Sequence, residues 1–356
     1  MAWEYGDSFD HFATADITEK WTQLFESGAP VSGIISSANG RFGTSSFRSS
    51  IDSDADQAVI YKTLSSSIAT RLYGFAFKTD KLPTGTNAKA FFEVRDAGTT
   101  QCDLRLLADG TLRATRNGTT LGTSTFSIST GIYYYFEVKV TIGSSGVFQV
   151  KVDNTTRLDL SGVNTQNTGA ATHNQVGIGW GLGNLGSSGV ILADYDDFYC
   201  IDTTGADNND YLGDIHAEAL FPNGAGNYSQ WTLVDAALTN TLNYQSADET
   251  PPNDDSDYNG GGSAGLKDTY TFGNLTVTAA SIKVVVINMN ARKDDSGSRS
   301  IASLTRIASV DYLGSTINTD GTYKFLQQAY ATSPATGVAW TVSEINGLEE
   351  GVQVIA

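Results

Sequence analysis

The chain has 356 residues, of which 40% are hydrophobic and 10% aromatic, so it is long enough for about two domains with apolar cores. Lysine and arginine number 22 against 39 aspartates and glutamates. The resulting formal net charge of −17 repels phosphate backbones and excludes nucleic acid as an expected partner. The same charge opposes binding to anionic membranes. No apolar run reaches the ~18 residues of a membrane span, and the first residues carry no secretory signal pattern.

The predicted elements are almost all strands, because apolar and polar residues alternate in short segments between turn residues. Ile17–Phe25 is the exception and favours one or two helical turns. Before residue 202 and outside the meander described next, the predicted strands are Val59–Thr63, Arg71–Lys78, Ala90–Arg95, Tyr133–Ile142, Val147–Val152, Val176–Trp180, Val190–Asp194 and Tyr195–Ile201.

Cys102–Gly122 carries the strongest local signal in the chain. Asp109-Gly110 and Asn117-Gly118 separate three short alternating segments there. Such pairs favour tight hairpin turns because both residues accept positive φ. The segment predicts a three-stranded antiparallel meander, and with it an all-β sandwich for the first half of the chain.

A domain boundary is expected in the polar, turn-rich segment Asp202–Asp210, which divides the chain into residues 1–204 and 205–356. The second region is also predicted to be all-β, as a smaller β-sandwich with a long polar loop at Ser246–Gly265. Its predicted strands are Ile215–Leu220, Thr269–Phe272, Ser281–Ala291, Ile301–Val310, Thr322–Tyr330 and Gly351–Ile355.

The two cysteines, Cys102 and Cys200, fall on separate predicted strands. Their spacing leaves two alternatives open, a disulfide or two buried free thiols. No cysteine or histidine spacing matches a zinc site.

The first half of the chain resembles the concanavalin A-like, laminin-G-like jelly roll. The resemblance is carried by Asp7–Phe12, the meander, Gly131–Ile142, Val147–Leu158 and Ala193–Asp202. In that fold the first and last strands pair, which implies that Ser8–Phe12 lies beside Tyr195–Ile201 in one antiparallel sheet.

The whole chain resembles virion proteins of tailed bacteriophages, in its opening segment and in Asn209–Trp231, Ala291–Ile301 and Ser333–Val354. The resemblance implies a non-enzymatic structural protein that decorates the capsid or forms part of a tail appendage. It would assemble in the host cytoplasm as a homo-oligomer, contact other virion proteins and attach to the particle through residues 205–356.

Candidate catalytic residues are few. Glucanases on this fold carry Glu-x-Asp-x-x-Glu on one strand, and that triple does not occur here. The nearest cluster is Asp194, Asp196 and Asp197, for which a structural role is expected. Ser263 fits a Gly-x-Ser-x-Gly pattern but lies in a glycine-rich loop and has no histidine after it, so a hydrolase triad is rejected.

Asp255, Asp257 and Asn259 match the first half of a calcium-binding loop. Leu266 stands at the twelfth position, where a bidentate glutamate is needed. The alternatives are a weak Ca²⁺ site of another geometry and a solvated acidic loop. No other cofactor is expected.

Exposed aromatic rings are candidate sugar platforms, because a ring face stacks on the CH face of a pyranose. Trp180, in the run Gly177–Gly186, and Tyr134 are the candidates for a host-surface glycan. The alternative for both is ordinary sandwich core. The first alternative to the virion function is therefore a lectin-like receptor-binding protein, and the second alternative is a polysaccharide depolymerase.

Overall fold

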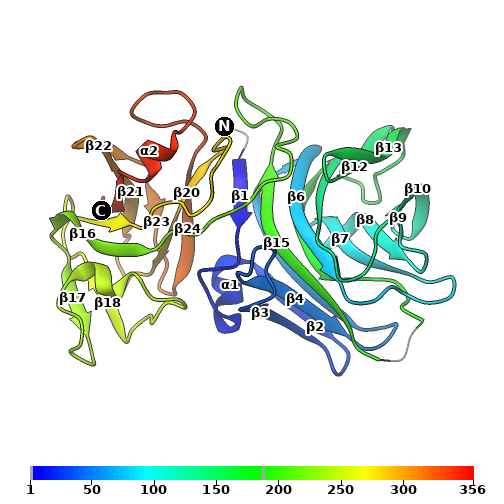
Figure 1. Cartoon of the computed structure of the whole chain (residues 1–356), viewed down its shortest axis with the longest axis horizontal. Coiled ribbons are helices and arrows are strands. Elements are labelled where there is room, and N and C mark those ends of the chain that lie inside the picture. The colour runs from blue at the N-terminus through cyan, green and yellow to red at the C-terminus, as the bar shows by residue number, and fades with distance from the viewer. Residues whose placement is uncertain (1–2, 187–188) are drawn as a thin grey trace. The chain divides into compact units, whose positions relative to one another are not determined.

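The computed structural model describes residues 3–186 and 189–356, which form two compact units, Met1–Ala217 and Glu218–Ala356 (Figure 1). The division falls later than the expected boundary at 204 and 205, because residues 210–217 pack against the first unit. No helix in the described part of the chain is long and apolar enough to cross a membrane.

The first unit consists of two antiparallel sheets, sheet A and sheet B, with two short helical turns, η1 (Thr14–Asp16) and α1 (Ile17–Lys20). Sheet A runs β13 (Thr155–Val163), β12 (Gly146–Val152), β11 (Tyr134–Thr141), β6 (Thr70–Thr79), β15 (Ile191–Ile201), β4 (Ser46–Ile51) and β3 (Ser32–Ser36), and β1 (Trp3–Asp7) also pairs with β15. Sheet B runs β10 (Thr119–Ser127), β9 (Thr111–Arg116), β8 (Thr99–Leu107), β7 (Ala88–Asp96), β14 (His173–Trp180), β5 (Gln57–Ile68) and β2 (Gln23–Ser27).

Aromatic rings from the two sheets meet in the core between them. Phe75 of β6 stacks on Phe92 of β7 at 5.6 Å between ring centroids, and Phe77 lies 4.6 Å from Phe91. All four side chains are almost fully buried. The predicted all-β, jelly-roll sandwich is confirmed, and its stability comes from apolar burial of roughly 1.5–3 kcal/mol for each such side chain.

The predicted meander is β8, β9 and β10. Asn117 and Gly118 have φ of 44° and 81°, as a two-residue hairpin turn requires. At the first turn only Gly110 has positive φ, of 81°, so the expectation of positive φ at both residues was wrong for Asp109. The short helix also forms, but it ends at Lys20, and β2 begins at Gln23 inside the segment expected to be helical.

The strand that pairs with β15 at the start of the chain is not the segment that was expected. β1 is Trp3–Asp7, and it pairs with β15 through Asp7↔Phe198 and Trp3↔Ile201. The segment Ser8–Phe12 is not a strand, because Phe9 takes a φ of 60° and turns the chain into the core. The expected pairing of residues 8–12 was therefore wrong, although β15 is the closing strand.

The second unit is smaller and also β-rich. A six-stranded sheet runs β16 (Pro222–Ser229), β19 (Lys267–Phe272), β25 (Glu349–Val354), β21 (Ser300–Ile307) and β22 (Val310–Leu313), with β23 (Ile317–Asn318) beside β21. The remaining elements are the pairs β17 (Thr232–Asp235) with β18 (Asp257–Gly260) and β20 (Val285–Ala291) with β24 (Lys324–Tyr330), and the short helices η2 (Asn243–Ser246) and α2 (Val342–Ile345).

Two sequence expectations fail in this unit. Residues 215–220 are not a strand, and the loop expected at Ser246–Gly265 contains β18, whose partner β17 precedes it. A core cluster of Ile307, Trp340 and Leu348 holds the unit together. Elsewhere, both cysteines of the first unit are free and buried.

Candidate functional site

Trp180 cannot serve as a sugar platform, because none of its surface is exposed. Its ring meets Phe77 edge-on at 6.0 Å, and its backbone N–H donates to the Ser49 hydroxyl at 3.0 Å. The prediction of an exposed Trp180 is corrected by its position on β14, where it faces the core of the sandwich.

Tyr134 is half-buried at the start of β11. Its ring packs edge-on against Phe126 at 6.0 Å, and its hydroxyl accepts a hydrogen bond from the Ser129 backbone at 3.1 Å. These contacts tie Tyr134 to the β10–β11 connection and use its hydroxyl there. It lies far along the chain from the core position of Trp180, and the structure gives no contact between the two.

Asp255, Asp257 and Asn259 use their polar groups on different partners. Asp255 forms an ion pair with Arg292 at 2.6 Å, while Asp257 accepts from Asn240 at 2.9 Å. Asn259 donates to the Asn243 carbonyl at 2.8 Å. One side-chain oxygen each of Asp257 and Asn259 is buried without a partner. Within residues 3–186 and 189–356, no group of three or more His, Cys, Asp or Glu side chains could hold a metal ion.

Asp194 is buried and fully engaged with cations. It receives two hydrogen bonds from Arg48, at 2.7 and 3.0 Å, and lies 3.3 Å from the Lys78 ammonium. Its contacts join β15 to its two neighbours in sheet A.

A β-bulge in β15 lets both Asp196 and Asp197 contact Arg41. Pairing of β15 with β6 shifts register between Asp196 and Tyr199, and Asp197 takes a φ of 52°. Both carboxylates reach Arg41, whose backbone N–H donates to Asp196 at 2.7 Å and whose guanidinium lies 3.5 Å from Asp197. Burial is the main cause that raises the pKa of both carboxyls, to about 8 for Asp196 and about 7 for Asp197.

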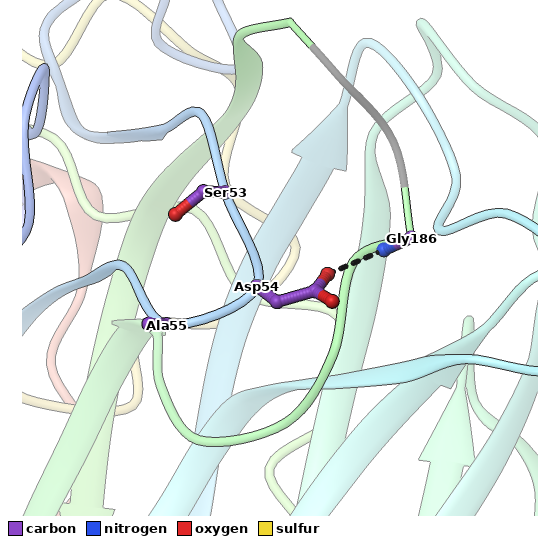
Figure 2. Close-up of a pocket in the computed structure, with 4 residues that line it drawn as sticks. All are labelled: Ser53, Asp54, Ala55 and Gly186. Carbon is purple, nitrogen blue, oxygen red and sulfur yellow. Dashed lines mark hydrogen bonds between the residues drawn. The ribbon is translucent and has the colours of Figure 1, made fainter.

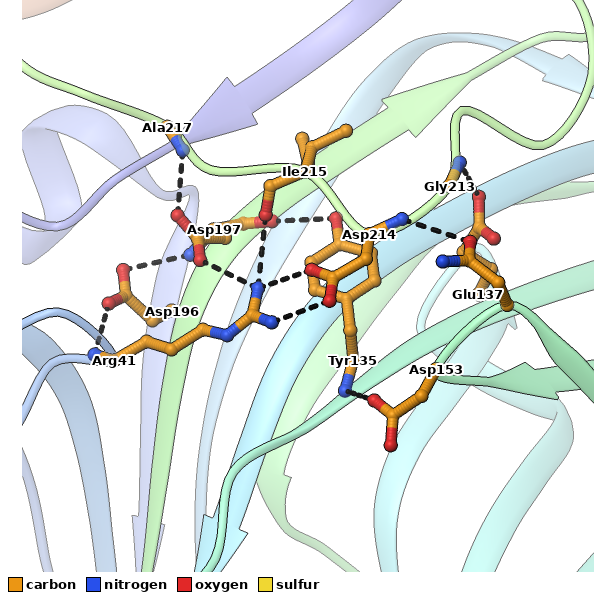
Figure 3. A network of polar contacts seen from close by, with 11 residues as sticks. Arg41, Tyr135, Glu137, Asp153, Asp196, Asp197, Gly213, Asp214, Ile215 and Ala217 are labelled. Carbon is orange, nitrogen blue, oxygen red and sulfur yellow. Dashed lines mark hydrogen bonds and ion pairs between the residues drawn. The ribbon is translucent and has the colours of Figure 1, made fainter. Parts of the chain in front are cut away.

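Arg41 fastens residues 210–217, which we call the strap, to sheet A (Figure 3). Its guanidinium binds both oxygens of Asp214, at 2.5 and 2.7 Å, and donates to the Ile215 carbonyl at 3.1 Å. The Ala217 backbone N–H donates to Asp197 at 2.7 Å. Arg41 and Asp197 therefore hold the strap in place through Asp214, Ile215 and Ala217.

A shallow hollow is lined by Ser53, Asp54, Ala55 and Gly186 (Figure 2). The Asp54 carboxylate accepts from the backbone N–H groups of Leu185 and Gly186, at 2.7 and 2.6 Å. These bonds lower the pKa of Asp54. Its charge is already used to join two loops, so the hollow offers little to a ligand.

An array of charged and polar side chains lies on the outer face of sheet B. We define this array as the arginine face, and its position follows from alternation: Phe92, Leu104 and Ala114 point into the core, so their neighbours point outward. Its members are Tyr61, Glu93, Arg95, Asp103, Arg105, Arg113 and Thr115.

Pairing registers place one row of this face across five strands. Tyr61 of β5 and Glu93 of β7 both lie opposite Gly177 of β14, and Glu93 in turn lies opposite Asp103 of β8. Asp103 lies opposite Thr115 of β9. Four side chains from distant parts of the chain thus form one line across the sheet.

Hydrogen bonds fix the row in place. The Tyr61 hydroxyl donates to Glu93 at 2.5 Å, and the Thr115 hydroxyl donates to Asp103 at 2.6 Å. The second Glu93 oxygen accepts from Thr100 at 2.6 Å. Burial, followed by the negative charge of Glu93, raises the pKa of Tyr61. The phenol therefore stays protonated, and its proton is committed to Glu93.

Gly177 makes room for Tyr61. A Cβ added at Gly177 would lie 2.5 Å from Cε1 of the Tyr61 ring, a distance that side chains do not tolerate. The absence of a side chain in the middle of β14 thus lets the ring lie over the strand and reach Glu93 on the far side.

Arginines flank the row on both sides. The Arg95 guanidinium stacks over the Tyr61 ring at 4.3 Å and lies 3.6 Å from Glu93. Arg105 donates twice to Asp103, each time at 2.8 Å, and the side-chain hydrogen bond raises the pKa of Arg105. Arg113 lies directly opposite Arg105 across the β8–β9 pair. The row from Tyr61 to Thr115 is almost fully buried, and the three arginines beside it are the partly exposed groups of the face.

Sequence reasoning missed this face because its residues come from strands that are not consecutive. The segments Ala90–Arg95 and Cys102–Leu107 show the alternation of charged and apolar residues that marks an outward polar face. The order of the strands along the chain does not reveal that β14 lies between β5 and β7 in the sheet. This spatial order is what brings Tyr61 to Glu93.

The sequence matches no protein-family model and no curated protein. Among solved structures it is similar to an endo-β-1,4-glucuronan lyase from the fungus Trichoderma reesei, with 14% identity, a TM-score of 0.41, and coverage of 51% of this chain and 90% of the lyase. It is also similar to an alginate lyase, with 13% identity, a TM-score of 0.39, and coverage of 56% of this chain and 94% of the lyase. A cellulose-induced protein is similar too, with 13% identity, a TM-score of 0.39, and coverage of 50% of this chain and 91% of that protein. At these scores the likeness carries no argument about activity.

Proposed function

We propose that the protein is a non-enzymatic, lectin-like binding protein whose first unit takes a surface glycan on the arginine face. The observation that carries the proposal is the group of partly exposed arginines, Arg95, Arg105 and Arg113, which a buried row of hydrogen-bonded side chains holds in place. Sugar hydroxyls need planar, preorganised hydrogen-bonding groups, and a rigid sheet holds such groups better than a loop does.

Binding is favoured over catalysis by the state of the two carboxylates. Glu93 accepts from Tyr61 and Thr100, and Asp103 accepts from Arg105 and Thr115. A general acid or base must lie within hydrogen-bond reach of its substrate, and both of these carboxylates are buried beneath their neighbours. Carboxylates engaged in this way position their neighbours instead.

A glycan array probed with the intact chain tests the proposal. We expect binding to a limited set of glycans that is weakened at least about tenfold by Arg95→Ala, since a hydrogen bond to a charged group contributes roughly 1.5–3 kcal/mol. The matched control is Arg299→Ala, which removes the same charge from an exposed position in the second unit. Retained binding in the Arg95 variant, with an unchanged melting temperature, would contradict the proposal.

Catalysis has its own test. The intact chain is incubated with the glycans that it binds, and release of reducing ends or of unsaturated uronates is followed. We expect neither product. Product formation that is lost in Tyr61→Phe, which keeps the ring and removes the hydroxyl, would replace the lectin proposal with a depolymerase.

We further propose that this binding serves a tailed-bacteriophage virion, as a capsid decoration or tail appendage. The support is the resemblance of Asn209–Trp231, Ala291–Ile301 and Ser333–Val354 to segments of such virion proteins. The test is mass spectrometry of purified particles from a phage that encodes the chain. Particles that lack it would end the virion proposal and leave the glycan proposal standing.

A further inference from the structure

We propose that the ligand of the arginine face is an anionic polysaccharide, whose carboxylate or sulfate groups bind across Arg105 and Arg113. This inference rests on the proposed glycan binding and adds the charge of the ligand. It depends on three observations about the two arginines.

The first observation is their register. Arg105 and Arg113 are direct partners across the antiparallel pair β8–β9. Side chains in that relation have Cβ atoms roughly 4.5–5.5 Å apart, and like charges there are destabilising. Two adjacent guanidinium groups on one face of a sheet therefore need an anion, and an anion placed between them would bind both.

The second observation is that Asp103 neutralises only one of the two. Its carboxylate takes two hydrogen bonds from Arg105 and one from Thr115. Arg113 is half-buried, and its buried Nε has no hydrogen-bond partner. Hydrogen bonds from Thr111 are the main cause that lowers the pKa of Asp109 in the β8–β9 turn, and the charge of Arg113 adds to it. The buried Nε itself cannot reach a ligand, so the partly exposed end of the Arg113 guanidinium is the part that would bind one.

The third observation is the contrast with the rest of the molecule. The chain carries a formal net charge of −17, yet Arg95, Arg105 and Arg113 gather on one face of one sheet. General attraction of polyanions is excluded by that net charge. Recognition at this face must come from short-range, bidentate contacts, for which the planar guanidinium fork suits carboxylate and sulfate groups.

The experiment measures binding of the full chain to three soluble polysaccharides by calorimetry. The probes are a polyuronate, dextran sulfate and neutral dextran. We expect binding of a charged probe and none of dextran, and we expect affinity to fall as salt is raised because ions screen the contacts. Of the two charged probes, the tighter binder distinguishes a carboxylate ligand from a sulfate ligand.

Arg113→Ala is the informative variant, because the Nε of this arginine has no hydrogen-bond partner among the described residues. We expect at least about a tenfold loss of affinity for the charged probe. Arg113→Lys should recover only part of it, since an ammonium keeps the charge and lacks the fork. Arg299→Ala is the matched charge control, and melting temperatures establish that every variant is folded.

The outcomes separate this inference from the proposal beneath it. Binding of dextran or another neutral glycan that is lost in the Arg95 variant and unaffected by Arg113→Ala overturns the anionic ligand and leaves glycan binding in place. A complete lack of binding to all glycans overturns both. An equal loss in Arg113→Ala and Arg299→Ala would reduce the effect to net charge and also overturn the inference.

Discussion

Trp180 shows how far a residue's role depends on the sheet around it. The side chain is fully buried against Phe77, so Trp180→Ala would leave a large cavity in the core of the first unit. We expect a loss of about 3–5 kcal/mol in the free energy of unfolding. Denaturant unfolding of the first unit measures it, and a variant as stable as the parent chain would show that the ring does not pack as described.

Glu350 gives the second unit a pH-dependent stability. The side chain is buried on β25, neither carboxylate oxygen has a hydrogen-bond partner of normal geometry, and burial raises the pKa to about 8. The unfolded chain loses this proton near pH 4.5, while the folded chain keeps it until about pH 8. Stability is therefore lost as the pH rises through that window.

Glu350→Gln should remove this loss. At pH 7 we expect the second unit to gain up to about 3 kcal/mol, since one pKa unit corresponds to about 1.4 kcal/mol. At pH 4 the gain should vanish, because the carboxyl is then protonated in both states. Unfolding curves at the two pH values measure the difference, with Asp320→Asn on the surface as a control. A gain of equal size at both values would contradict the assignment.

The strap is an element held by polar contacts to Arg41 and Asp197 and by apolar packing of its own side chains. Arg41 supplies both bonds to Asp214 and lies against Asp197. We expect Arg41→Ala to loosen the strap and to destabilise the first unit by roughly 1.5–3 kcal/mol. Hydrogen exchange of the strap amides measures the loosening.

The matched control for the strap is Lys139→Ala. That lysine pairs with Asp210, whose side chain is 65% exposed, so the ion pair contributes little to stability. Fast exchange in both variants would show that the strap depends on charge in general. Slow exchange in Arg41→Ala would show that the apolar residues of the strap hold it alone.

β1 is the other short element on which the stability of the first unit depends. Deletion of residues 1–7 removes Glu4, the ion-pair partner of the fully buried Arg71, and Asp7, which accepts from Trp21 at 2.7 Å. An unpaired buried charge costs about 3–5 kcal/mol. We expect the deletion to lower the melting temperature of the entire first unit. Removal of a mere tail would leave that temperature unchanged.

At the scale of elements, sequence patterns predicted correctly those features that depend on neighbouring residues alone. The meander followed from Asp109-Gly110 and Asn117-Gly118, because turn residues fix their own φ. The bulge at Asp196 and the left-handed Phe9 could not be predicted, since both depend on packing against distant strands. The arginine face shares this cause, as it needs the spatial order β5-β14-β7-β8-β9.

At the scale of the whole molecule, the exposed linker between the two units lies before the point where the units divide. Residues 204–207 are exposed, whereas the strap after them packs on the first unit through Tyr211, Leu212 and Ile215. A chain cut at Gly205 would therefore still have the strap of its C-terminal fragment bound to the N-terminal fragment.

A protease site inserted after Gly205 tests this, because exposed polar loops tolerate insertions. After complete cleavage, we expect the two fragments to elute together in size-exclusion chromatography. Lys151 over the Tyr211 ring at 3.7 Å and the Gly213 N–H on Glu137 at 2.9 Å add to the Arg41 contacts that hold them. The double variant Arg41→Ala, Leu212→Ala should let the fragments separate. Fragments of the parent chain that elute apart, or fragments of the double variant that stay together, would show that the strap is not what joins the C-terminal fragment to the first unit.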